Sequence, residues 1–140
     1  NYRMSNVLAA IGVAQMEVIE ERIKRTREVN EIYRKEVGHL FYTFQEERKT
    51  DRSNMWLTCA LMKGEDKPED LIAHLEKDNI EARRIWKPMH EQPIMSKYLK
   101  YINGNSSLLF LQGITLPSGS DLTKQDLKRI IKSIKTFFDK

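Results

Sequence analysis

Cysteine is nearly absent from this sequence, and its scarcity excludes two kinds of site. The 140 residues include a single cysteine, Cys59, so no disulfide can form within the chain. This fits a reducing compartment, and we expect a cytoplasmic protein. The three histidines, His39, His74 and His90, have no metal-ligand spacing with Cys59 or with a carboxylate. We therefore predict no metal site and interpret Cys59 as a small core residue.

Long apolar runs, a glycine-rich phosphate loop and a strong charge excess are also missing. No apolar run approaches the roughly 20 residues that a membrane helix needs, and residues 1–16 lack the pattern of a signal peptide. The 24 basic and 20 acidic residues leave a net charge of only +4, a smaller surplus than dedicated nucleic-acid-binding domains carry. We predict one globular domain with no membrane partner and no nucleic-acid partner.

Proline is absent before Pro68, and the first part of the chain has the pattern of a long helix. Ser5 is a suitable N-cap and Gly38 a suitable stop, so we predict one helix over residues 5–37. Apolar residues occupy most sides of its first half, which predicts burial against a domain that this sequence does not include. The second half is densely charged and is interpreted as a solvated face.

Short alternating elements follow, and they predict an α/β domain. Strands are expected at residues 41–44, 55–62, 80–85 and 114–116, with residues 55–62 central because they are apolar on both sides. A helix begins at Pro68 and ends near Asn79, with His74 exposed. A last helix follows Thr123, which forms a weakened capping box with Asp126. The periodicity of residues 106–112 does not distinguish a buried helical turn from a strand.

The densest group of binding side chains lies in residues 80–95, IEARRIWKPMHEQPIM. Arg83, Trp86, Lys87 and His90 are close together here, and two prolines exclude a helix interior. We predict a short strand at residues 80–85 that runs into an ordered loop. A loop with this composition is typical of a binding site. The alternative is a strand end with a half-buried tryptophan, and composition alone favours neither.

Three segments carry motifs of a known family. Residues 82–93 are ARRIWKPMHEQP, residues 1–15 begin with NYRM and continue with AA-x-G-x-x-Q, and residues 116–120 are LPSGS. These segments resemble the C-terminal domain of the DegT/DnrJ/EryC1/StrS family, which are pyridoxal-phosphate-dependent sugar-nucleotide aminotransferases. Arg84 departs from the pattern, because the family commonly has proline there. The resemblance extends from Asn1 to Phe138.

The resemblance implies a fold and an assembly. The chain would be the small C-terminal domain of a type I, aspartate aminotransferase-like fold, with a small, mostly antiparallel sheet flanked by a long N-terminal helix and a C-terminal helix. Residues 1–140 would form this single domain, with residues 5–37 as the interdomain helix and the large cofactor domain absent. The parent would be a homodimer with active sites shared across the interface.

The resemblance also implies roles for individual residues. Asn1 would reach the phosphate of pyridoxal 5'-phosphate in the neighbouring subunit, and Arg3 would lie beside the nucleotide-sugar substrate. Further substrate contacts would come from Arg83, Trp86, Lys87 and His90. No catalytic residue is expected in this chain, because the Schiff-base lysine and the acidic partner of the pyridine nitrogen lie upstream in the family.

The implied reaction transfers an amino group from an amino acid, with glutamate favoured, to a keto-sugar nucleotide. The motifs most resemble enzymes that act on a UDP-4-keto-6-deoxy-HexNAc for surface polysaccharide or glycan biosynthesis. The fragment by itself is expected to be inactive. The alternative belongs to another class: a stand-alone basic α/β module that binds nucleic acid or a protein partner without catalysis.

Overall fold

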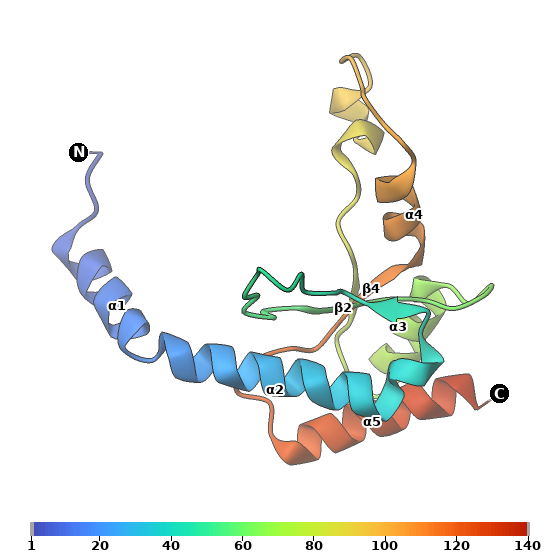
Figure 1. Ribbon diagram of the computed structural model, residues 1–140, viewed down its shortest axis with the longest axis horizontal. Coiled ribbons are helices and arrows are strands. Elements are labelled where there is room, and N and C mark those ends of the chain that lie inside the picture. The colour runs from blue at the N-terminus through green and yellow to red at the C-terminus, as the bar shows by residue number, and fades with distance from the viewer. Residues whose placement is uncertain (1, 140) are drawn as a thin grey trace.

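A computed structural model describes residues 2–139 of the chain, and Figure 1 shows how its elements are arranged. Within this range one antiparallel four-stranded sheet has the order β1-β2-β4-β3. Its strands are β1 (Thr43–Phe44), β2 (Thr58–Leu61), β3 (Arg83–Arg84) and β4 (Gly113–Leu116). The expected α/β class with a small antiparallel sheet is confirmed, and so is the central position of β2.

Three helices pack on one face of this sheet: α2 (Ile19–Val37), α3 (Pro68–Lys77) and α5 (Lys124–Phe138). The core lies between them and the sheet, and includes Tyr33 of α2, Leu71 of α3 and Ile134 of α5. Along β2, Thr58 and Ala60 are buried, whereas Cys59 and Leu61 are only half-buried. Because side chains alternate along a strand, the second pair faces the side that the helices leave open.

Local signals in the sequence explain where two of these helices begin. Pro68 occupies the start of α3, where its missing N–H costs nothing. At the start of α5, Thr123 Oγ1 accepts a hydrogen bond from the Asp126 N–H at 3.1 Å, and Asp126 Oδ2 accepts one from the Thr123 N–H at 3.0 Å. The capping box is therefore complete, with aspartate in the place of the usual glutamate.

The N-terminal segment is two helices, so the prediction of one continuous helix was wrong. Ser5 caps α1 (Asn6–Glu17) as expected, but the backbone leaves helical geometry at Val18 (φ −112°, ψ 4°) before α2 begins. Val18 and Ile19 are consecutive β-branched residues, which lowers helix propensity at the junction. No residue of α1 is buried, and Figure 1 shows it running away from the sheet. No packing therefore holds it in line with α2.

Residues 86–112 form an arm that projects from the sheet in Figure 1. It contains the 3-10 helices η2 (Met89–Glu91) and η3 (Pro93–Met95) and then α4 (Asn105–Gln112). Residues 106–112, for which the sequence left helix and strand open, therefore form a helix, although no residue of α4 is buried. A third 3-10 helix, η1 (Gly38–Leu40), closes the end of α2.

Two other expectations need correction. The strand predicted at residues 80–85 is only β3, and Ile80 still belongs to the turn that leaves α3, because its N–H bonds to the Leu75 carbonyl at 3.0 Å. His74 is half-buried rather than exposed. Its Nε2 lies 3.1 Å from the Ser133 carbonyl, and its ring meets the edge of Phe137 on α5. Both contacts of His74 arise because α5 packs across α3. The periodicity of α3 alone could not predict them.

Candidate functional site

The face of the sheet opposite the helices forms an open groove of about 840 Å³. Cys59 and Leu61 of β2 form part of its floor, and Ile85 and Trp86, which follow β3, form part of its wall. Gly113 is required at this point, because a Cβ added there would lie 2.5 Å from both Ile85 Cδ1 and the Leu109 carbonyl. The missing side chain therefore allows the strand that leads to Trp86 to pack closely against β4.

Trp86 stands at the groove with 68% of its surface exposed. Its ring stacks on Trp56, which is 63% exposed, with the centroids 6.1 Å apart and 27° between the planes. Trp56 is not among the residues that the sequence predicted to bind a ligand. A signal was available, because Trp56 is one of only two tryptophans and lies at the start of the central strand predicted at residues 55–62.

The loop that carries Trp56 is fastened to α2 by charged side chains. Arg27 donates from Nη1 and Nη2 to the two carboxylate oxygens of Glu47, both at 2.9 Å, and the Ser53 N–H also donates to Glu47. These donors lower the pKa of Glu47 to about 2. Arg52 pairs with Glu20 of α2 at 2.7 Å. The loop of residues 45–57, which includes Trp56, is therefore held against α2.

His90 is turned into the arm. Its Nε2 lies 3.1 Å from Ser107 Oγ of α4 and 3.7 Å from Glu91 Oε1, and only 17% of its side chain is exposed. The contact ties η2 to α4, so the imidazole helps to fix the conformation of the WKPMH loop. A ligand that reaches His90 must share the imidazole with Ser107.

The two adjacent arginines have different partners. Arg83 is exposed and pairs with Glu81. Arg84 pairs with Glu69 in the first turn of α3, donates to the Phe110 carbonyl, and stacks its guanidinium 4.1 Å from the centroid of the Phe110 ring. Arg84 thus fastens the arm to the body of the domain. This contact gives a structural reason for an arginine at the position where the resembling motif commonly has proline.

Four of the predicted substrate-binding residues lie within one short stretch of the chain, but among them only Trp86 lines the groove. The arm and the end of β3 carry Arg83, Trp86, Lys87 and His90, and Lys87 is exposed beside Trp86. Arg3 is exposed at the far end of α1, which Figure 1 shows apart from the sheet and the arm. Asn1 lies outside the described residues. The ligand roles of all these residues remain predictions.

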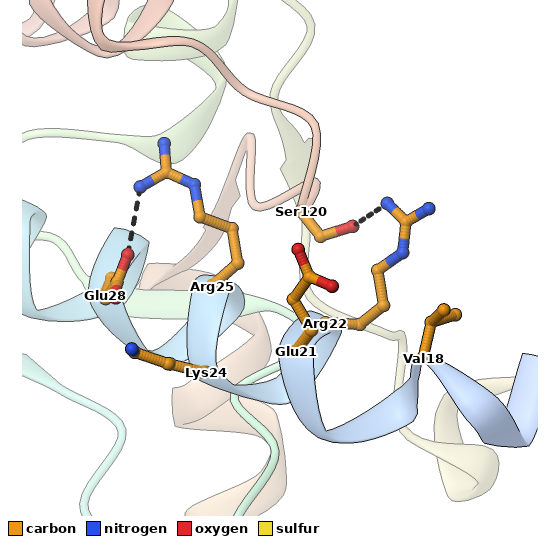
Figure 2. A pocket seen from close by; sticks show the side chains of 7 residues that line it. All are labelled: Val18, Glu21, Arg22, Lys24, Arg25, Glu28 and Ser120. Carbon is orange, nitrogen blue, oxygen red and sulfur yellow. Dashed lines mark hydrogen bonds and ion pairs between the residues drawn. The ribbon is translucent and has the colours of Figure 1, made fainter.

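A second pocket, of about 410 Å³, lies between α2 and the turn that begins at Ser120, the last residue of the LPSGS segment (Figure 2). Both of its arginines have partners within the chain: Arg22 Nη1 donates to Ser120 Oγ at 2.9 Å, and Arg25 Nη1 lies 3.2 Å from Glu28 Oε2. Arg25 also donates to the Leu122 carbonyl at 2.5 Å. We interpret this pocket as a polar packing contact that holds the turn against α2.

Pyridoxal phosphate needs a lysine for its imine and an acid facing its pyridine nitrogen, in one pocket. No lysine lines the groove beside Trp86, and Glu46 is its only acidic residue. The groove beside Trp86 therefore lacks the residues of a complete cofactor site. Residues 2–139 also contain no cluster of histidine, cysteine or carboxylate side chains that fits a metal ion, and no helix suited to spanning a membrane.

Comparisons with known proteins agree with the motifs. Residues 1–135 match the sequence model of the DegT/DnrJ/EryC1/StrS aminotransferase family. The chain is 38% identical to the putative pyridoxal phosphate-dependent aminotransferase EpsN of Bacillus subtilis, over 99% of this chain and 37% of that protein. It is 34% identical to the GDP-perosamine synthase of Escherichia coli O157:H7, with the same two coverages.

Solved structures show the same fold. PseC of Helicobacter pylori, an aminotransferase involved in the biosynthesis of pseudoaminic acid, superposes with a TM-score of 0.85 at 18% identity, over 99% of this chain and 38% of PseC. DesV of S. venezuelae superposes with a TM-score of 0.86 at 15% identity, over 99% and 38%. The chain thus spans little more than a third of the relatives it matches. It belongs to the DegT/DnrJ/EryC1/StrS aminotransferase family.

Proposed function

We propose that this chain is the C-terminal, substrate-binding and dimer-contacting part of a pyridoxal-phosphate-dependent sugar-nucleotide aminotransferase. The observation that carries the proposal is the family match over residues 1–135, in a chain that spans only about 37% of its relatives. The large domain of the parent supplies the Schiff-base lysine and most of the cofactor site. Residues 1–140 form the small domain, and residues 5–37 form the segment that joins it to the large domain.

The proposed task of this domain is to bind and orient the substrate. Trp86 offers an exposed aromatic face for a base or sugar ring. Arg83 and Lys87 flank it with positive charge that suits a diphosphate, and the guanidinium can donate two hydrogen bonds at once. His90 is assigned a contact with the sugar or a phosphate, for which its imidazole must leave Ser107 or share the contact with it. The exposure of Arg83 and Lys87 supports these roles, because neither side chain is buried within the domain.

The proposed substrate is a keto-sugar nucleotide, and we favour a UDP-4-keto-6-deoxy-HexNAc with glutamate as the amino donor. The resemblance of the WKPMH and LPSGS segments supports the UDP sugar, whereas the names of the GDP-perosamine synthases make a GDP sugar the competing substrate. The product would enter a surface polysaccharide or another glycan. The single, half-buried thiol of Cys59 is consistent with the cytoplasmic location that we propose.

The parent is proposed to be a homodimer. Val7, Ile11 and Met16 on α1 are 70%, 55% and 67% exposed, which is unfavourable for an apolar helix in water. In the parent, the large domain and the second subunit cover these side chains. Asn1 then reaches the cofactor phosphate of the neighbouring subunit, and Arg3 lies beside the nucleotide-sugar substrate.

Steady-state kinetics of the full-length parent test the proposal. Arg83→Ala and Lys87→Ala are expected to raise KM for the keto-sugar nucleotide about tenfold, the effect of removing one charged hydrogen bond, with KM for glutamate unchanged. Arg48→Ala is the matched control, because Arg48 is an exposed arginine on another loop. Unchanged kinetics in both variants would contradict the proposal. If charge-reversal variants of Lys128 and Lys132 on α5 lost binding to nucleic acid or to a protein partner, the result would support a basic binding module instead.

A further inference from the structure

Two large aromatic rings are exposed next to each other: Trp86 lines the groove, and Trp56 stacks on it. Only Trp86 has a proposed role. Trp56 and Trp86 are the two tryptophans of the chain. They stack with 27° between their planes, yet each keeps about two-thirds of its surface in contact with water. Stacking therefore removes little apolar surface from water. A pair that only protected itself would be more completely buried.

The backbone around Trp56 holds its side chain in this exposed position. Met55 is buried and has a φ of 48°, a left-handed conformation that is uncommon for a long side chain. The Met55 N–H donates to Ser53 Oγ at 3.1 Å, and the Trp56 N–H donates to Asn54 Oδ1 at 3.2 Å. Such backbone geometry often accompanies a functional position. Here it places a tryptophan against another tryptophan rather than in the core.

A connection to α2 keeps this short segment in place. Thr26 Oγ1 donates to the Asn54 carbonyl at 2.5 Å, and Arg27 donates to the Ser53 carbonyl while it holds Glu47. The loop that ends in Trp56 therefore depends on α2, whereas the loop that begins with Trp86 depends on β3 and the arm. Two separately anchored segments therefore meet at their tryptophan rings.

The chemistry beside the pair suits a planar heteroaromatic ring that carries phosphate. Arg83 and Lys87 precede and follow Trp86 closely in sequence, and both are exposed. Aromatic faces stack on any nucleobase, and the adjacent cations attract its phosphates. We propose that Trp56 is a second aromatic wall of the nucleotide subsite and determines affinity for the base. This inference rests on the proposed function, because it extends the subsite of Trp86 to a residue on another loop.

Intrinsic fluorescence of this chain tests the inference, because Trp56 and Trp86 are its only tryptophans. We expect UDP and GDP to quench the emission in a saturable manner. Trp56→Leu is expected to weaken both nucleotides about tenfold, the scale of one lost base–aromatic contact, whereas Trp56→Phe keeps most of the affinity. Inorganic pyrophosphate has no base. It is therefore expected to bind with equal affinity to the original chain, to Trp56→Leu and to Trp56→Phe, as measured by calorimetry.

Each outcome separates the inference from the proposed function. If Trp56→Leu binds nucleotides as the original chain does while Trp86→Leu does not, Trp56 is not part of the subsite and the proposed function stands. If Trp56→Leu weakens pyrophosphate as much as UDP, its role is structural and the inference is wrong. If neither the original chain nor any variant binds a nucleotide, the proposed nucleotide subsite itself is contradicted. Should Trp56→Leu fail to fold, Trp56→Gln replaces it, because the position is exposed.

Discussion

At the scale of single residues, the pairing of Glu47 with Arg27 makes stability depend on pH. The folded state lowers the pKa of Glu47 from an ordinary value of 4.5 to about 2, because the Arg27 guanidinium and the Ser53 N–H both donate to the carboxylate. A depressed carboxyl pKa stabilises the fold above pH 4.5, and the contribution is lost as the pH falls through about 2.

We therefore predict that Glu47→Gln lowers the urea midpoint at pH 7 and that its difference from the original chain shrinks between pH 4.5 and pH 2. Urea unfolding at pH 7, 4.5, 3 and 2, followed by circular dichroism, measures this. Glu46→Gln is the control, since Glu46 is the exposed neighbour of Glu47. We expect the urea midpoint of this variant to differ from that of the original chain by the same amount at every pH. A difference for Glu47→Gln that does not change with pH would show that the ion pair does not contribute.

Gly113 gives a second prediction at the residue scale. Alanine at this position would place a Cβ 2.5 Å from Ile85 Cδ1 and 2.5 Å from the Leu109 carbonyl. Overpacking of this kind costs about 1–3 kcal/mol, so Gly113→Ala is expected to destabilise the domain by that amount in urea unfolding. Adding Ile85→Ala should restore only part of the loss, because the Leu109 carbonyl is backbone. A variant as stable as the original chain would show that β4 has room at Gly113.

At the scale of the elements, the beginning of α5 depends on one hydroxyl. Thr123 and Asp126 satisfy each other's backbone N–H groups, and loss of such a cap costs about 1 kcal/mol. Thr123→Ala is expected to lower the free energy of unfolding by this amount. Thr136→Ala is the matched control, because Thr136 bonds only to the Lys132 carbonyl within the helix, and its removal should be neutral. Equal effects of the two changes would contradict the role of the cap.

The helices α1 and α2 should differ in local stability although they are consecutive. No residue of α1 is buried, whereas α2 buries Val29, Tyr33 and Val37 in the core. Amides in segments with few buried contacts open at low free energy. We predict that hydrogen exchange is fast throughout residues 6–17 and slow at residues 29–37 in this chain. Slow exchange in α1 would mean that another surface covers it in solution, such as a second copy of the chain.

At the scale of the whole molecule, features set by local chemistry could be predicted from the sequence. The capping box at Thr123, the proline at the start of α3 and the two-sided apolar pattern of β2 each depend on neighbouring residues, and the structure contains all three. The family could be predicted for a similar reason, because the segment from Arg83 to Pro93 keeps its order and spacing.

Features that depend on distant contacts could not be predicted. His74 is half-buried because α5 packs across α3, and Trp56 meets Trp86 because two separate loops converge. The interruption at Val18 reflects the absence of any packing partner for α1 as much as its own β-branched side chain. Helical periodicity does not predict the contacts of His74 and Trp56, because each joins parts of the chain that lie far apart in sequence.

The central claim is that this chain binds substrate and does not hold the cofactor's reactive lysine. The most direct test incubates the chain with excess pyridoxal phosphate, reduces it with borohydride, and measures intact mass and modified peptides. We predict no label or scattered labelling of many lysines in this chain, and one labelled lysine outside these residues in the full-length parent. Stoichiometric labelling of a single lysine within this chain would contradict the claim, because the domain would then contain its own cofactor site.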